Sequence, residues 1–381
     1  MEENKQRRGF ITKLLFGSAS VFLYPFSGLG TKQQNSKNAM KSPVIQRVRP
    51  LGFQWETLDP FLFCVHHEDF FPKGNNELGP DPSHFSGRHM GQDFIVKDGF
   101  RMYHGTKVPG FPGHPHRGFE TITVVRKGLV DHVDSTGAAG RYGNGDVQWM
   151  TAGKGVQHAE MFPLLNKDTD NPLELFQIWL NLPKKSKMVE PHFKMLWSEE
   201  VPKFSVKDTN GKEIAFVEVL VGKLNEASSK AAPPDSWAAV SDNHVGVFNI
   251  KIESGGTYTL PASVVGINRS LYFYEGSKLQ IEGTEIKPYH AADVRSEEQI
   301  SLVNSGNDVV KILVLQGRPI SEPVVQHGPF VMNTREEIYQ AFNDYQKTQF
   351  GGWPWPTYDH VHPADRGRFA RHSDGRLEEK A

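Results

Sequence analysis

The sequence has almost no cysteine, almost no net charge and no long apolar run. Cys64 is the only cysteine among 381 residues, which excludes an internal disulfide, a cysteine-rich zinc site and a CxxC redox centre. Any bound metal must therefore be held by histidine and carboxylate side chains. The formal net charge of -1 provides no field that would attract a polyanion, so nucleic acid is a poor candidate partner.

The N-terminus carries the one apolar stretch that resembles a targeting segment. The stretch from Leu14 to Phe26 is shorter than the ~20 residues needed to span a membrane. It follows basic residues, among them Arg7 and Arg8, and precedes small ones, which is the layout of an export signal. "RRGFITK" also resembles the twin-arginine export motif. We therefore predict export to the periplasm through residues 1–30. The alternatives to a cleaved signal are an uncleaved anchor and an accidental basic start; without export the protein would be cytoplasmic.

The rest of the chain has the pattern of a β protein. Short β-branched and aromatic runs alternate with Gly, Asn, Asp and Pro, as in sandwiches and barrels, and they fall into two sets. Residues 334–348 predict a helix, because Thr334 and Glu337 have the spacing of a capping box. The predicted organisation is an export signal (1–30), a polar linker (31–46), an N-terminal barrel (47–183), an interdomain connection (184–203), a C-terminal barrel (204–320), and a C-terminal helix with an irregular tail (321–381).

Two histidine-containing motifs predict a metal site. In "GHPHRGFETITVV", His114 and His116 are one residue apart at the head of an apolar strand, so both side chains would leave the same face. In "QHAEM", His158 and Glu160 have the same spacing. Three imidazoles and one carboxylate on neighbouring strands would suit a first-row divalent ion, iron above all, and would leave positions open for substrate or dioxygen.

The spacing of two histidines is weak evidence when it stands alone. The chain has sixteen histidines, and the same spacing recurs at His360 and His362 in the tail. The strand context, the second paired motif and the glycine-rich turns before each pair favour ligation by the first set.

Several long stretches resemble the pirin family of bicupins. The resemblance runs in order from about Leu58 to Lys347 and rests on "HPHRGFETIT", "GDVQWMTAGKGVQHAEM", "LELFQIWLNLP", "KMVEPHF" and "HGPFVMNTREEI". It implies an all-β fold of two tandem cupin (jelly-roll) barrels with short helices. It also implies a mononuclear Fe(2+) in the N-terminal barrel, held by residues matching His114, His116, His158 and Glu160.

The resemblance implies two alternative functions. Some family members have quercetin 2,3-dioxygenase activity, which here would act on a flavonol or related small aromatic substrate and dioxygen, with Glu160 as the catalytic group that accepts the hydroxyl proton. Others are described as redox-responsive regulators, which would make this chain a non-enzymatic, iron-dependent binding protein. The oligomeric state does not follow from the sequence.

The sequence also departs from the general cupin pattern. Glu120 stands where ordinary cupins have a glutamate ligand, so it is the rival to Glu160; the pirin-like "HAE" favours Glu160 and leaves Glu120 beside the ligands or in a buried hydrogen bond. In the second barrel Val264 falls where His116 stands in the first, so we expect no metal there. Residues 66–104 look like an insertion that could form a lid over the site.

Overall fold

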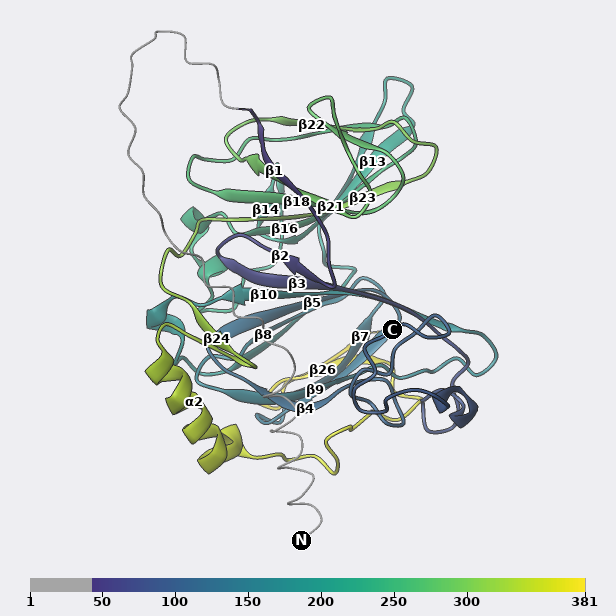
Figure 1. Cartoon of the computed structure of the whole chain (residues 1–381), viewed down its shortest axis with the longest axis vertical. Helices are drawn as coiled ribbons and strands as arrows, with labels where there is room; N and C mark the ends of the chain where they lie inside the picture. The colour runs from purple at the N-terminus through teal and green to yellow at the C-terminus, as the bar shows by residue number, and fades with distance from the viewer. Residues whose placement is uncertain (1–42, 381) are drawn as a thin grey trace.

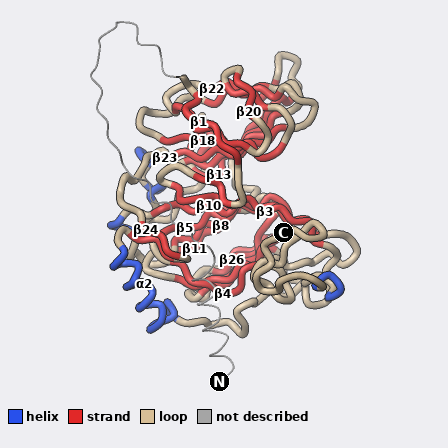
Figure 2. Tube along the Cα trace, viewed as in Figure 1, coloured by secondary structure: helices blue, strands red, loops and turns tan. Residues whose placement is uncertain are grey.

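The protein is built from two β-barrels that pack against each other. The computed structural model describes residues 43–380, and the first barrel lies below the second in Figure 1. Strands dominate both barrels and are joined by loops and short helical turns (Figure 2). Within residues 43–380 no helix is both long and apolar enough to cross a membrane. The predicted export signal and most of the predicted linker lie outside the described residues.

The first barrel consists of two six-stranded sheets. One contains, in spatial order, β11 (His192–Leu196), β8 (Val147–Thr151), β5 (Phe119–Lys127), β10 (Asn171–Asn181), β3 (Phe61–Phe71) and β2 (Gln54–Glu56). The other contains β27 (Leu377–Lys380), β26 (Arg368–Arg371), β7 (Ala139–Gly143), β6 (Leu129–Asp134), β9 (Val156–Met161) and β4 (Gly110–His116).

The second barrel pairs a large sheet with a small one. The large sheet contains β1 (Ile45–Pro50), β21 (His290–Arg295), β18 (Asn268–Glu275), β23 (Val310–Gly317), β16 (Gly246–Ile252), β13 (Glu213–Val221) and β12 (Lys203–Lys207). The small sheet contains β17 (Thr257–Leu260), β22 (Ile300–Asn304), β19 (Leu279–Ile281) and β20 (Thr284–Ile286). Two short hairpins, β14 (Lys223–Leu224) with β15 (Ala227–Ser228) and β24 (Val325–His327) with β25 (Phe330–Met332), complete the strands.

The two barrels share one continuous apolar core. Side chains from the β5 sheet of the first barrel and the large sheet of the second form a single buried cluster, in which Trp55 stacks on Tyr272 with ring centroids 5.3 Å apart. Along β5, Ile122 and Val124 point into this cluster, whereas Val125 belongs to the core inside the first barrel. Alternation along the strand therefore assigns one face of β5 to the other barrel and one face to the barrel's interior.

Two strands, β1 and β11, belong to a different part of the fold from the one predicted for them. Strand β1 pairs with β21 in the second barrel, although residues from 47 onward were predicted to belong to the first. Strand β11 lies within the predicted interdomain connection, but it pairs with β8 as an edge of the first barrel. Neither exchange has a local sequence signal, because strand partners are chosen by packing between distant segments.

The C-terminal region from residue 321 onward contains the predicted helix and four strands, β24 to β27, that were not predicted. Helix α2 (Arg335–Thr348) begins after Thr334, whose side chain accepts the backbone N–H of Glu337, while the Glu337 carboxylate accepts the backbone N–H of Thr334. This confirms the capping box. The prediction of an irregular tail is wrong at its end, where β26 and β27 extend the sheet that carries β9. The remaining helical turns are η1 (Pro82–Phe85), η2 (Lys184–Ser186), η3 (Trp237–Ala239), η4 (Ser241–Asn243) and η5 (Gln349–Gly351).

Candidate metal centre

Two adjacent antiparallel strands position the predicted histidines. His114 on β4 is directly opposite His158 on β9, and His116 lies two residues further along β4. The turn after β4 depends on Gly118, which has a φ of +86°. A Cβ at this position would lie 2.0 Å from the carbonyl oxygen of Val331, so only glycine fits. The chain thereby brings β4 and β5 together with both imidazoles directed inward.

Three imidazoles converge at this point. One ring nitrogen from each of His114, His116 and His158 lies within 4.8 Å of the other two. Both ring nitrogens of His158 and Nδ1 of His116 are buried without a hydrogen-bond partner in the protein. His114 Nδ1 lies 3.0 Å from the carbonyl oxygen of Pro112, which orients the ring and leaves its Nε2 available as a ligand.

The electrostatics of these imidazoles suit a cation. Burial, reinforced by the neighbouring histidines, lowers the pKa of His116 and His158 well below the ordinary value of 6.5. Both rings are therefore neutral at neutral pH and present lone pairs. Buried imidazoles that lack partners and lie this close together fit a divalent metal ion, because a bound ion would satisfy all of them at once. Within residues 43–380, no other group of three or more His, Cys, Asp or Glu side chains converges in this way.

Glu160 lies beside the three imidazoles rather than among them. Its Oε2 is 3.8 Å from His158 Nε2 and accepts a hydrogen bond of 2.8 Å from Gln177 Nε2, while its Oε1 accepts one of 3.1 Å from Thr123 Oγ1. Burial raises the pKa of the Glu160 carboxyl, and His132 and these two hydrogen bonds oppose that rise. The carboxylate is thus held inside the barrel beside the three converging imidazoles, with both of its oxygens in hydrogen bonds.

Glu120 does not face the metal centre. It lies on the face of β5 that packs against the second barrel, where its carboxylate accepts hydrogen bonds of 2.6 Å from Thr151 Oγ1 and 2.5 Å from Ser236 Oγ. Burial raises the pKa of the Glu120 carboxyl from 4.5 to about 7. Of the two places predicted for Glu120, beside the ligands or in a buried hydrogen bond, the structure has the second, because Gly118 and the turn that follows His116 change which face of the chain the even-numbered residues occupy.

Sequence reasoning missed several polar side chains inside the first barrel. His132 on β6 is fully buried, its ring centroid is 5.4 Å from that of His158, and its Nε2 lies 3.2 Å from Asp134 Oδ2. Gln177 and Thr123 orient Glu160. The two-residue period of a strand could have found them, because His132 shares a strand face with the inward-facing Val130, and Gln177 shares one with the inward-facing Leu175.

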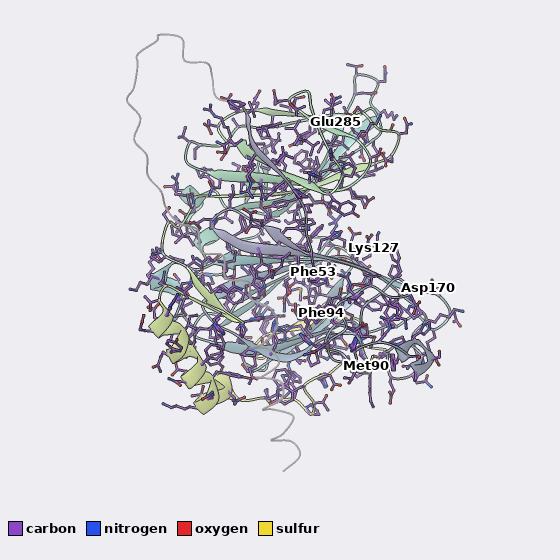
Figure 3. All side chains as sticks on the ribbon, in the orientation of Figure 1. Phe53, Met90, Phe94, Lys127, Asp170 and Glu285 are labelled. Carbon is purple, nitrogen blue, oxygen red and sulfur yellow. The ribbon has the colours of Figure 1, made fainter. Side chains whose placement is uncertain are left out.

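The histidine cluster is bordered by aromatic rings. Phe119 stacks on Trp179 at 3.9 Å, and the His116 ring is 5.1 Å from that of Phe119. On the other side the Phe111 ring lies 6.3 Å from that of His114 and 6.4 Å from that of Phe94, which is labelled in Figure 3.

Phe94 belongs to the segment predicted as an insertion and lid. The first six residues of that segment, 66–71, are part of β3 and not of a lid. The remainder is tied down by buried ion pairs, with Arg88 Nη1 2.8 Å from Asp93 and Arg101 Nε 2.9 Å from Asp69. The histidines of this segment are not part of the cluster.

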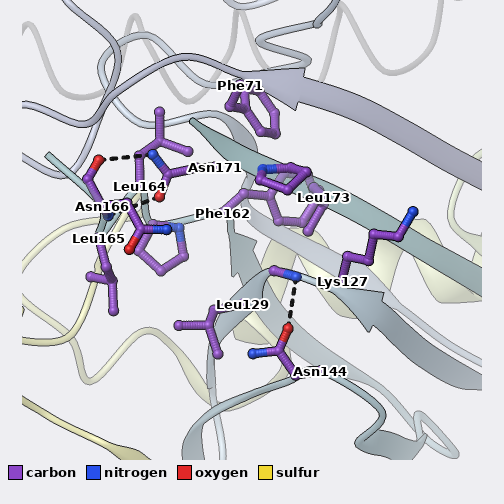
Figure 4. A pocket seen from close by; sticks show the side chains of 13 residues that line it. Phe71, Lys127, Leu129, Asn144, Phe162, Leu164, Leu165, Asn166, Asn171 and Leu173 are labelled. Carbon is purple, nitrogen blue, oxygen red and sulfur yellow. Dashed lines mark hydrogen bonds between the residues drawn. The ribbon is translucent and has the colours of Figure 1, made fainter. Parts of the chain in front are cut away.

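A separate hollow of about 400 Å³ lies at the rim of the first barrel, where β5, β7, β9 and β10 end or begin (Figure 4). Its wall includes Phe162, Leu173 and Lys127, and two hydrogen bonds, from Asn171 to the Asn166 carbonyl and from the Gly128 amide to Asn144, brace its edge. None of the four predicted ligands lines it.

The second barrel has no comparable chemistry at the corresponding place. Val264, predicted to replace a histidine, lies in the loop between β17 and β18 and is 41% exposed. The barrel's interior cluster is formed by Val, Ile, Leu, Phe, Ala and Tyr side chains, and the buried Arg269 beside this cluster donates a hydrogen bond of 2.9 Å to Gln316.

The two stacked jelly-roll barrels, one with a converging histidine cluster and one with an apolar interior, define a bicupin with a single candidate metal centre. The pirin family model matches residues 82–180, and the model of the pirin C-terminal cupin domain matches residues 247–351. The chain is 33% identical to human pirin over 267 residues, which cover 68% of this chain and 82% of that protein. The chain belongs to the pirin family.

Other relatives have names that refer to an enzyme. A Pseudomonas aeruginosa protein with the name "Putative quercetin 2,3-dioxygenase" is 35% identical over 274 residues, covering 70% of this chain and 88% of its own length. The crystal structure of a quercetin 2,3-dioxygenase from Acinetobacter baumannii superimposes with a TM-score of 0.63 at 25% identity, and the match covers 81% of this chain and 98% of that one.

Proposed function

We propose that the protein is an iron(II)-dependent dioxygenase of the quercetin 2,3-dioxygenase type that cleaves a flavonol or a related phenol. The observation that carries the proposal is the convergence of three imidazoles inside the first barrel of a pirin-family chain, with buried ring nitrogens of His116 and His158 that have no hydrogen-bond partner. The enzyme names of the relatives support the choice of reaction class. We propose His114, His116, His158 and Glu160 as the ligands.

A bound iron(II) would supply an open coordination position for the deprotonated substrate hydroxyl and for dioxygen. The protein's own residues would do the rest. Glu160, oriented by Gln177 and Thr123, would take the proton from the hydroxyl of the substrate. Phe111 lies beside His114 and Phe94 lies beside Phe111, and these two rings would offer surfaces against which a flat aromatic ring can pack.

The test is oxygen uptake by the full chain after anaerobic loading with iron(II), with a panel of flavonols and other catechol-like phenols. We expect uptake with at least one compound, and we expect His114→Ala and Glu160→Ala to reduce it by at least about 100-fold, as loss of a metal ligand or of the proton acceptor does. His290→Ala is the matched control, because His290 belongs to the second barrel and its Nδ1 contacts only the Pro288 carbonyl. It should leave uptake unchanged.

Failure of every compound to draw oxygen, in a protein that binds iron through His114, would overturn the dioxygenase proposal. That result would favour the alternative of a non-enzymatic, iron-dependent regulatory protein. Its location matters for that alternative, because a protein exported through residues 1–30 could not meet a cytoplasmic partner.

A further inference from the structure

A polar cavity lies away from the metal centre, where three distant chain segments meet. Its volume is about 510 Å³, and its wall is formed by residues 191–195 at the edge strand β11, Lys230 from the second barrel, and residues 372–378 of the C-terminal hairpin. Phe193 separates it from the imidazole cluster: its ring stacks on His132 at 5.2 Å and contacts the His372 ring at 5.5 Å. A molecule in this cavity would therefore not touch the proposed metal ligands.

Cationic side chains converge on the cavity from all three segments. Lys194 comes from β11, Lys230 from the second barrel and Arg376 from the hairpin, and the imidazoles of His192 and His372 lie beside them. Burial, followed by the positive charges of Lys230 and Arg376, lowers the pKa of the Lys194 ammonium. The direction of that effect indicates that like charges are held close together here.

The carboxylates in the wall are already engaged. Glu378 accepts hydrogen bonds from Trp197 Nε1 at 2.7 Å, from His372 Nε2 at 2.8 Å and from Arg376. Asp374 accepts the backbone N–H of Arg376 at 2.9 Å, which closes the turn of the hairpin.

Lys194 is different from the other two cations. Lys230 forms an ion pair of 2.6 Å with Glu200, and Arg376 contacts Glu378. Lys194 donates only to the carbonyl oxygen of Ala231, and among the described residues no carboxylate lies within 4.0 Å of its ammonium. A partly buried ammonium among like charges is costly unless an anion joins it.

We infer that this cavity binds a small molecule through a phosphate group, with Lys194 as the central contact and Arg376 and Lys230 at its sides. A phosphate has enough oxygens to accept from Lys194 and at the same time from Arg376 and Lys230, which keep their own carboxylate partners, whereas a carboxylate has only two oxygens and a single charge. The volume is within the ~300–1,000 Å³ range of small-molecule sites, so it has room for more than an isolated ion. The inference does not depend on the reaction proposed for the metal centre.

The test is calorimetric titration of the full, metal-free chain with inorganic phosphate, with sodium chloride and sodium acetate at matched ionic strength as comparisons. We expect phosphate to bind with a dissociation constant of about 1 mM or tighter, and acetate at least about 10-fold more weakly. Lys194→Gln should weaken phosphate binding by about 10-fold or more. Lys251→Gln, which removes an ion-paired lysine on the second barrel, is the matched control and should bind as the unaltered chain does.

Three results would overturn the inference: no phosphate binding beyond that of chloride at about 10 mM, unchanged binding by Lys194→Gln, or equal losses in Lys194→Gln and Lys251→Gln. Should Lys194→Gln fail to fold by circular dichroism, Arg376→Gln provides the second variant, and the same 10-fold loss is expected. Oxygen uptake at the metal centre is measured separately, so failure here and failure of the proposed dioxygenase activity are distinguishable.

Discussion

The two barrels have the same architecture and opposite interiors. Inward-facing positions of the first barrel carry His132, His158, Glu160, Thr123 and Gln148, all of them buried. The interior cluster of the second barrel is aliphatic and aromatic, and the buried Arg269 and Gln316 beside it are hydrogen-bonded to each other. A jelly roll therefore does not require a polar centre, and an apolar filling is sufficient to hold it closed. The polar interior of the first barrel calls for a separate, chemical explanation.

The buried polar atoms that lack hydrogen-bond partners indicate why the first barrel has a polar interior. Within residues 43–380, the buried side-chain atoms without a hydrogen-bond partner include ring nitrogens of His116, His132 and His158, together with Thr121 Oγ1 and Gln148 Nε2. The interior of the second barrel has the hydroxyl of Tyr258. Such groups cost roughly 1–3 kcal/mol each when they remain unpaired, so their concentration in one barrel indicates a place that a ligand completes.

The largest expected effect distinguishes the barrels by their metal content. The unaltered chain should bind one equivalent of iron(II), and His158→Ala should weaken this binding by more than about 100-fold, because it removes a central ligand. His290→Ala in the second barrel should bind as the unaltered chain does. Anaerobic dialysis followed by metal analysis measures all three. A stoichiometry of two would show that the second barrel also has a site and would break the comparison.

Equivalent Leu→Ala substitutions in the two barrel interiors should separate effects on stability from effects on metal binding. Leu175 and Leu271 are buried in the interiors of the first and second barrel, respectively. We expect each Leu→Ala change to lower the free energy of unfolding by about 2–5 kcal/mol, because each leaves a cavity. Only Leu175→Ala, two residues from Gln177, should also weaken iron(II) binding. Chemical denaturation and metal titration of the two variants test this, and equal losses of affinity would contradict it.

The smallest predicted effect concerns the interface between the barrels and depends on pH. The folded-state pKa of Glu120 is raised to about 7 from 4.5, so the folded chain binds this proton more tightly than the unfolded chain. The related stability is fully present below about pH 4.5 and is lost as the pH rises through about 7. Glu120→Gln mimics the protonated form and should be more stable than the unaltered chain above pH 8, by up to about 3 kcal/mol, with little difference at pH 5.

Thermal or denaturant unfolding at several pH values measures this difference. The control is Glu285→Gln at an exposed position of strand β20 in the second barrel, which should not alter the pH profile. Parallel pH profiles for Glu120→Gln and the unaltered chain would show that the Glu120 carboxyl does not titrate in this range.

Much of the fold was predictable because its signals are local. Alternation of side chains along a strand placed His114 with His116, and His158 with Glu160, before any partner strand was known. The capping box at Thr334 and Glu337 likewise depends on residues only three positions apart, and the structure confirms it. Long motifs shared with the pirin family indicated two cupin barrels, and the structure has them.

The remaining features depend on contacts between distant segments. The pairing of β1 with β21 and of β26 with β7, the orientation of Glu120 toward Ser236, and the cavity between β11 and the C-terminal hairpin each join residues that are more than a hundred positions apart. By itself the sequence determined which side chains share a face of a strand, because backbone geometry repeats every two residues. Only the tertiary structure decided which faces meet, because that choice depends on the burial of apolar surface summed over the whole chain.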